Sequence, residues 1–207
     1  MKKLIASFMN IKHTFSRFFR LNNLKNTQKI LWSDLKKYFE HANKTGANYK
    51  YGVFESEKYI TTHYSIDKAN NTRQYRYLLE AENYRLVSLV FISEGYDESK
   101  TTDVFILASH LNNILGEGIV RVNPDICTIL FEHRINELVP FLFPGEIHTQ
   151  VVRHYNHSLD IIWAFDQLLF HNQDPVFIAA ELLKRNDERI KKRNDERIKK
   201  TNSSEQK

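Results

Sequence analysis

The sequence lacks several features that would classify it quickly. It contains one cysteine, Cys127, so a single chain forms no disulfide and no zinc site built on several cysteines. It has no run of 18 apolar residues that would predict a membrane span. It also contains no P-loop, no dinucleotide-binding glycine fingerprint, no nucleophile elbow and no HExxH motif. These absences argue against the common enzyme classes that carry such motifs.

Negative charge is missing from the start of the chain. Residues 1–33 carry seven cations and no acid, and residues 184–200 carry nine cations and four acids. Residues 34–183 carry 13 cations and 20 acids, so the body is acidic although the whole chain has a net charge of +5. An acidic body repels phosphate, so we do not expect it to bind nucleic acid. Only the two basic ends could make such contacts.

Residues 1–21 have the pattern of a basic amphipathic helix. Their large apolar residues recur at spacings of four and three and therefore form one stripe. The candidate residues for contact with a partner or a membrane are Phe8, Ile11, Lys12, Phe15, Arg17 and Phe18. Such a stripe is stable only when it is covered by its own domain, by a partner protein or by an anionic membrane. The sequence leaves these three alternatives open.

The middle of the chain changes between helical and strand periodicity. Spacings of three and four predict helices at about 28–42, 102–115, 146–171 and 175–183. A period of two, or a short apolar run, predicts strands near residues 49–53, 60–66, 75–81, 86–92, 119–122 and 126–133. This order predicts an α+β fold with a mostly antiparallel sheet and flanking helices. The expected parts are a basic helix at 1–27, an α+β domain at 28–183 and a charged tail at 184–207.

The tail is a tandem repeat of eight residues. KRNDERIK occurs at Lys184–Lys191 and again at Lys192–Lys199. Each copy has one isoleucine and opposite charges four residues apart, so we expect a solvated helix. Truncation after Leu183 is then expected to change the free energy of unfolding by less than ~0.5 kcal/mol.

A short apolar run lies between two prolines. Phe141, Leu142 and Phe143 follow Pro140 and precede Pro144, which predicts a loop. Three consecutive apolar residues in a loop either fill the core or form an exposed contact patch. The sequence leaves both outcomes open.

The side chains that most resemble a metal site do not converge. His154, His157 and Asp160 spread over about 120° of one predicted helix, so we expect solvated side chains there. Cys127 is expected to fill the core from a strand, beside Ile129. The tyrosines of the predicted strands are expected to pack in the core instead of stacking on nucleic-acid bases. We therefore predict no catalytic residue, no metal and no cofactor.

Three segments resemble the YbjN-type domain family. They are Leu107–Gly116 (LASHLNNILG), the strand pair at Ile119–Ile135 and the sequence DPVFIAAELL that starts at Asp174. With the element order, the resemblance covers residues 30–183. It implies the fold of type III secretion chaperones. The family is bacterial and is described as candidate sensory-transduction regulators without assigned catalytic residues, which implies a binding or chaperone-like module.

Together, the residues and the resemblance predict a non-enzymatic, cytoplasmic protein of a bacterial cell. It would bind another protein, whose identity the sequence does not give, and a homodimer is one expected form. The alternative is a peripheral membrane or nucleic-acid-associated protein that acts through its basic ends. An anionic membrane surface is therefore the second expected contact, and a hydrolase or metalloenzyme is the third interpretation.

Overall fold

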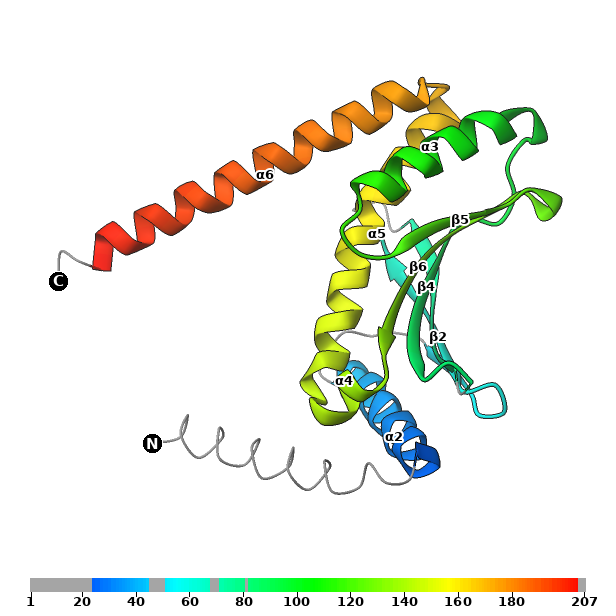
Figure 1. Ribbon diagram of the computed structural model, residues 1–207, viewed down its shortest axis with the longest axis vertical. Coiled ribbons are helices and arrows are strands. Elements are labelled where there is room, and N and C mark those ends of the chain that lie inside the picture. Colours follow the sequence, from blue (N-terminus) through cyan, green and yellow to red (C-terminus); the bar gives the residue numbers. More distant parts are fainter. Residues whose placement is uncertain (1–23, 45–50, 68–70, 81, 205–207) are drawn as a thin grey trace. The chain divides into compact units, whose positions relative to one another are not determined.

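The computed structural model describes residues 24–44, 51–67, 71–80 and 82–204 (Figure 1). The elements in chain order are α2 (Leu24–Ala42), β1 (Tyr51–Phe54), β2 (Tyr59–Ser65), β3 (Thr72–Glu80), β4 (Arg85–Ser93), η2 (Glu98–Lys100), α3 (Thr101–Ile114), β5 (Ile119–Asn123), η3 (Pro124–Ile126), β6 (Thr128–Asn136), α4 (Leu138–Leu142), α5 (Gly145–His171) and α6 (Pro175–Ser204). The strands form one antiparallel sheet in the order β1-β2-β3-β4-β6-β5. The predicted α+β class is confirmed.

The chain divides into two compact units. Unit 1 comprises residues 1–92 and 130–159, and unit 2 comprises residues 93–129 and 160–207. The boundary crosses β6 after Ile129 and α5 after Leu159, so both elements contribute to both units. Each unit has its own buried apolar side chains, such as Leu35 in unit 1 and Leu111 in unit 2.

Unit 1 contains the meander from β1 to β4. Strands β2 and β3 pair in a register that sets Thr62 opposite Tyr75 and Ile60 opposite Tyr77, and all four side chains are buried. Successive side chains of a strand point to opposite faces, so this register puts the large residues on one covered face. The period of two in the sequence predicted this alternation correctly. The tyrosines of β3 are core residues, as expected.

Helix α2 buries one stripe in unit 1. Leu31, Leu35 and Phe39 are fully buried at spacings of four, and the Phe39 ring lies 5.2 Å from that of Tyr77 on β3. The helical spacing in the sequence groups Tyr38 with Leu31 and Leu35, but Tyr38 is only half-buried and Phe39 takes the inner position. Helix α2 also lies beside α4 in the same unit (Figure 1).

The predicted loop around Phe141 is a short helix instead. The backbone N–H of Phe141 donates to the carbonyl oxygen of Glu137, and that of Phe143 donates to Val139. Pro140 is tolerated because it lies in the first turn, where a backbone N–H has no helical partner. The three residues separate: Phe141 is fully buried, Leu142 is half-buried and Phe143 is 53% exposed. Neither a core plug nor a contact patch describes all three.

Unit 2 is built around α3. Its buried face consists of Val104, Leu107, Ala108 and Leu111, as the helical spacing predicted. Asn112 extends the packing to β5, the last strand of the sheet. Its side-chain amide donates to the carbonyl oxygen of Val120 at 3.0 Å and accepts from the backbone N–H of Val120 at 2.7 Å. These bonds satisfy backbone groups of an edge strand and thus cover part of that edge.

The connection from β5 to β6 differs from the expected hairpin at Cys127. Residues Pro124–Ile126 form the 3-10 turn η3, and Cys127 follows it with a left-handed φ of 48°. Strand β6 begins only at Thr128, and Cys127 is half-buried. The prediction of a core cysteine within the strand was therefore wrong. Ile129 and Phe131, further along β6, are fully buried.

Helix α6 runs without a break from Pro175 to Ser204. In Figure 1 its C-terminal part (orange to red) extends away from α3, which belongs to the same unit. The first octad is held to α5: Arg185 lies 3.6 Å from the centre of the Trp163 ring, and Arg189 forms two 2.7 Å hydrogen bonds with the carboxylate of Asp160. The first octad is helical and six of its eight residues are exposed, as expected of a solvated helix, but these two arginines also tie it to α5.

These contacts change the expected effect of truncation. A cation–π contact and a partly exposed ion pair each contribute about 0.5–1 kcal/mol. We expect truncation after Leu183 to lower the free energy of unfolding by about 1–2 kcal/mol. Urea unfolding measures the loss, and truncation after Lys191 is the matched control because it keeps Arg185 and Arg189. Equal stability of the two truncated chains would show that the first octad contributes nothing.

Candidate functional site

His154 lies in the core of unit 1, on the buried side of α5. Its ring stacks on Phe131 with centroids 5.2 Å apart and planes inclined by 11°, and the rings of Tyr75 and Tyr77 meet it edge-on. Burial lowers the pKa of His154 to about 3, and the weak contact of Nε2 with the Phe131 carbonyl oxygen, 3.5 Å away, offsets this only partly. The imidazole is therefore neutral at pH 7. It has no contact with solvent through which a substrate or proton could reach it.

Two hydroxyl groups near His154 are bonded to each other. The hydroxyl groups of Tyr75 and Ser158 are 2.6 Å apart, and Ser158 donates to the carbonyl oxygen of Tyr155. Burial raises the pKa of Tyr75 to about 12, so the phenol stays protonated. The cluster is thus an uncharged, packed core. The sequence placed His154 at the edge of the apolar stripe and expected it to be solvated, but the structure buries it.

His157 and Asp160, the other two side chains considered as metal ligands, have different environments. His157 is half-buried on α5. Asp160 is engaged by the guanidinium of Arg189, whose pKa rises because of that hydrogen bond. Among the described residues there is no group of three histidine, cysteine or acidic side chains arranged to hold a metal ion.

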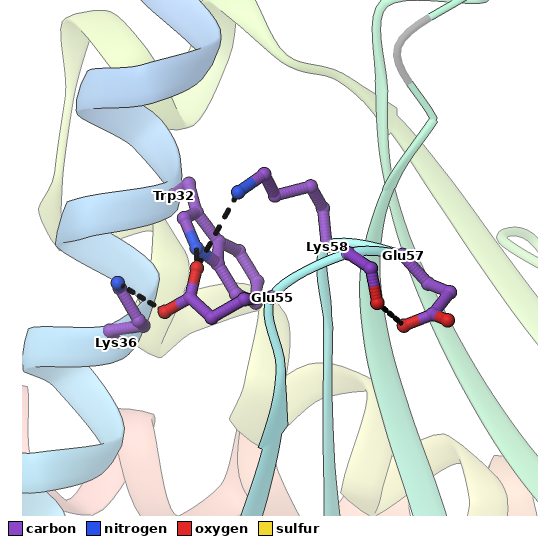
Figure 2. Close-up of polar contacts among 6 residues, drawn as sticks. Trp32, Lys36, Glu55, Glu57 and Lys58 are labelled. Atoms are coloured by element: carbon purple, nitrogen blue, oxygen red, sulfur yellow. Dashed lines mark hydrogen bonds and ion pairs between the residues drawn. The ribbon is translucent and has the colours of Figure 1, made fainter.

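A second polar cluster joins α2 to the β1–β2 turn in unit 1 (Figure 2). The Trp32 indole N–H donates to Glu55 Oε2 at 2.7 Å, and Lys36 donates to Glu55 Oε1 at 2.6 Å. Lys58 approaches Oε2 at 3.4 Å from the turn itself. The hydrogen bonds from Lys36 and Trp32 lower the pKa of Glu55 to about 2. The carboxylate is thus charged at pH 7, and both of its oxygens accept hydrogen bonds. This arrangement links α2 to the turn and does not suit proton transfer.

Glu137 is the remaining buried acid with a perturbed pKa. Its side chain is inaccessible to solvent. Burial raises the pKa of Glu137, and its interaction with Gln28 offsets this in part. A single enclosed carboxyl group provides neither a second catalytic group nor access for a substrate.

The turn between α5 and α6, in unit 2, is firmly held. Asn172 adopts a left-handed φ of 51°, a common way to end a helix, and Gln173 N–H donates to the carbonyl oxygen of Gln167 at 3.2 Å. Lys100 donates to the carbonyl oxygens of Leu168 and Leu169 at the end of α5. Its ammonium group lies where the helix dipole favours a cation.

The start of α6 is equally well defined. Asp174 accepts hydrogen bonds from the backbone N–H groups of Val176, at 2.8 Å, and Phe177, at 3.2 Å. Pro175 is buried and occupies the first helical position. Asp174 is thus the N-cap of α6, and the helix starts at Pro175 as its predicted range 175–183 requires. Caps on both sides therefore fix the geometry of this turn.

Two phenylalanines project from this rigid turn. Phe170 is 72% exposed near the end of α5, and Phe177 is 76% exposed in the first turn of α6. We refer to Phe170 and Phe177 as the corner aromatics. Aromatic side chains on a fixed backbone are the typical energetic centres of protein interfaces, because little conformational entropy is lost when they are covered. The corner aromatics form the best candidate for a functional site among the described residues.

The chain that surrounds the corner aromatics is acidic. Residues 93–129 and 160–183, which are unit 2 without its tail, contain ten acids and two cations. One of those cations, Lys100, is used in capping α5. Outside its tail, the unit that carries the exposed aromatic rings therefore has an excess of negative charge, which complements a segment that is both apolar and basic.

The residues singled out in the sequence do not form this site. Phe8, Ile11, Lys12, Phe15, Arg17 and Phe18 lie outside the described residues. Phe143, the exposed member of the Phe141–Phe143 run, belongs to unit 1. The sequence analysis missed Phe177, although Val176-Phe177-Ile178 held a signal. Three consecutive apolar residues of a helix span 200°, so one face cannot bury them all.

Comparison of the chain with protein-family models, with curated proteins and with solved structures finds no match. The resemblance to the YbjN-type domain therefore stays a prediction.

Proposed function

We propose that the protein is a non-enzymatic binding module whose corner aromatics contact a basic, amphipathic segment of a partner protein. The observation that carries this proposal is the exposure of Phe170 and Phe177 on a turn held by caps at both ends. Outside the tail, the same unit contains ten acids and two cations, which supply the charge preference for a basic segment.

The state of the polar side chains supports a binding role over catalysis. His154 is neutral and enclosed by aromatic rings, and Glu55 is fully engaged by Trp32 and two lysines. A general acid or base needs a pKa near the working pH and access to the substrate. The resemblance to the YbjN-type domain points in the same direction, towards a chaperone-like regulatory module of a bacterial cell.

The alternative role at a membrane or on nucleic acid rests on the basic ends, above all on the acid-free residues 1–33. Among the described helices, none is both long enough and apolar enough to cross a membrane. Attachment would thus use the surface of the bilayer, through the amphipathic stripe of residues 1–21. This alternative predicts sedimentation with anionic vesicles that salt reverses.

Binding of a labelled peptide tests the proposed function. The probe is a basic amphipathic helix of leucine and lysine, and fluorescence anisotropy measures its dissociation constant. The double substitution Phe170→Ser/Phe177→Ser should weaken binding about tenfold or more, because two exposed aromatic contacts are lost. Ile126→Ser is the matched control, since Ile126 is 63% exposed in the same unit but lies on η3.

Two results would contradict this function. One is equal affinity of the wild-type protein and the double variant for the probe, with unchanged circular dichroism spectra. The other is equal affinity for a leucine–glutamate peptide of the same length, which would remove the charge argument. If the double variant binds the probe more weakly, a pull-down from the native cell with the wild-type protein and the double variant in parallel would identify the natural partner.

A further inference from the structure

Helix α6 has an apolar stripe on the side that its own unit leaves uncovered. Val176, Leu183 and Ile190 are 53%, 48% and 56% exposed, and they are spaced by seven residues. Seven residues make almost two helical turns, so the three side chains lie nearly in line. We refer to Val176, Leu183 and Ile190 as the outer stripe.

The inner side of α6 is already occupied. Ile178, Ala179 and Leu182 are buried, and α6 packs on α3 in the same unit. Arg185 and Arg189 point to the same side, towards Trp163 and Asp160 of α5. The outer stripe is therefore an additional apolar face, and at 100° per residue its centre lies roughly 90° from that of the buried side chains Ile178, Ala179 and Leu182. A helix inside a monomer needs only one such face.

The charges along α6 suggest what covers the outer stripe. Its first part, from the cap at Asp174 to Leu183, contains two acids and no cation, whereas residues 184–200 contain nine cations and four acids. The helix is thus negative at its N-terminal end and positive at its C-terminal end. The helix that complements this arrangement is the same helix running in the opposite direction. Antiparallel pairing also opposes the two helix dipoles favourably.

We propose that α6 pairs with α6 of a second copy, antiparallel, about a two-fold axis next to Leu183. The outer stripe is self-complementary in this arrangement: Leu183 contacts Leu183 of the second copy, and Val176 contacts Ile190 of the second copy. A two-fold interface requires such self-complementarity, because each contact occurs twice.

The octad repeat limits the length of the outer stripe. The isoleucine of the second repeat follows Ile190 by eight residues instead of seven, so the spacing of the stripe ends at Ile190.

The expected dimer is reversible. The outer stripe extends over about 21 Å of helix and offers three large apolar side chains. A standard interface uses roughly 20–30 residues of each partner, so this one is small. Its population should therefore rise with protein concentration. This interface does not rest on the proposed function, because the corner aromatics are not part of the outer stripe.

Sedimentation of the full chain tests the dimer. The wild-type protein should shift from monomer to dimer as its concentration increases, and Leu183→Glu should remain monomeric at every concentration. Ile126→Glu is the control, since it adds the same charge at an exposed apolar position elsewhere in unit 2. Phe170→Ser/Phe177→Ser should dimerise like the wild type, which separates this interface from partner binding. A monomeric wild-type protein at its highest soluble concentration, or a Leu183→Glu variant that still dimerises, overturns the proposal.

Disulfide trapping tests the direction of the helices. In a Cys127→Ser background, a mixture of Val176→Cys and Ile190→Cys chains should oxidise to the mixed dimer, because the two positions meet only in the antiparallel arrangement. Neither variant alone should form the crosslink readily. Crosslinking of Val176→Cys chains with each other would indicate parallel helices and overturn the proposed geometry.

Discussion

Lowering the pH from 7 to 5 should reduce the free energy of unfolding of unit 1 by about 2 kcal/mol through His154 alone. The pKa of this imidazole is about 3 in the folded protein, because burial among aromatic rings disfavours the charged form. In the unfolded chain the pKa returns to 6.5. Between these values the unfolded chain binds a proton that the folded chain does not. The stability is therefore complete above pH 6.5 and is lost progressively towards pH 3.

Urea unfolding at several pH values measures this effect. The slope should approach about 1.4 kcal/mol per pH unit below the unfolded pKa, in addition to the contribution of other groups. Besides burial, His133 and His157 contribute to the low pKa of His154. Because Trp32 is in unit 1 and Trp163 is in unit 2, fluorescence reports on both units.

The substitution His154→Leu isolates the contribution of the His154 imidazole to the pH dependence of stability. The variant should lose about 2 kcal/mol of the difference between pH 7 and pH 5, since leucine has no proton to bind. His63→Gln is the control, because His63 is exposed on β2 and should leave the dependence unchanged. Full retention of the pH dependence in His154→Leu would mean that the imidazole is not buried as a neutral group.

The substitution Leu182→Ala should lower the free energy of unfolding of unit 2 by about 2–5 kcal/mol, the usual cost of a cavity at a buried leucine. Leu182 is 1% exposed on the inner side of α6. Its neighbour Leu183 is 48% exposed. Leu183→Ala should therefore change the free energy of unfolding by less than about 0.5 kcal/mol.

This pair of substitutions is a sensitive test of how α6 is oriented. Both positions carry the same residue type and are consecutive in the same helix, so differences in helix propensity cancel. The measurement is urea unfolding at low protein concentration, where any dimer through Leu183 has dissociated. Similar losses for both variants would mean that the inner and outer sides of α6 are assigned incorrectly.

The candidate site could be predicted from the sequence only in part. Asp174-Pro175 indicated the start of α6, because an N-cap and a proline at the first position act locally. The exposure of Phe177 depends instead on which face of α6 packs on α3. The same limit applies to Arg185 and Arg189, because their partners Trp163 and Asp160 lie in another helix. Local charge spacing predicted only ion pairs within the tail. The contacts that restrain the first octad are instead those with α5.

Periodicity by itself determined the α+β class, the approximate positions of most helices and strands, and the buried alternation of β2 and β3. These follow from the geometry of a single element, since period two and period 3.6 are properties of the backbone. Only the tertiary structure decided the environments of His154, Phe141 and Cys127. His154 is neutral because Phe131, Tyr75 and Tyr77 enclose it, and those residues come from strands distant in the sequence. Burial of a polar or aromatic side chain depends on the elements that cover it, and the spacing along one element cannot specify them.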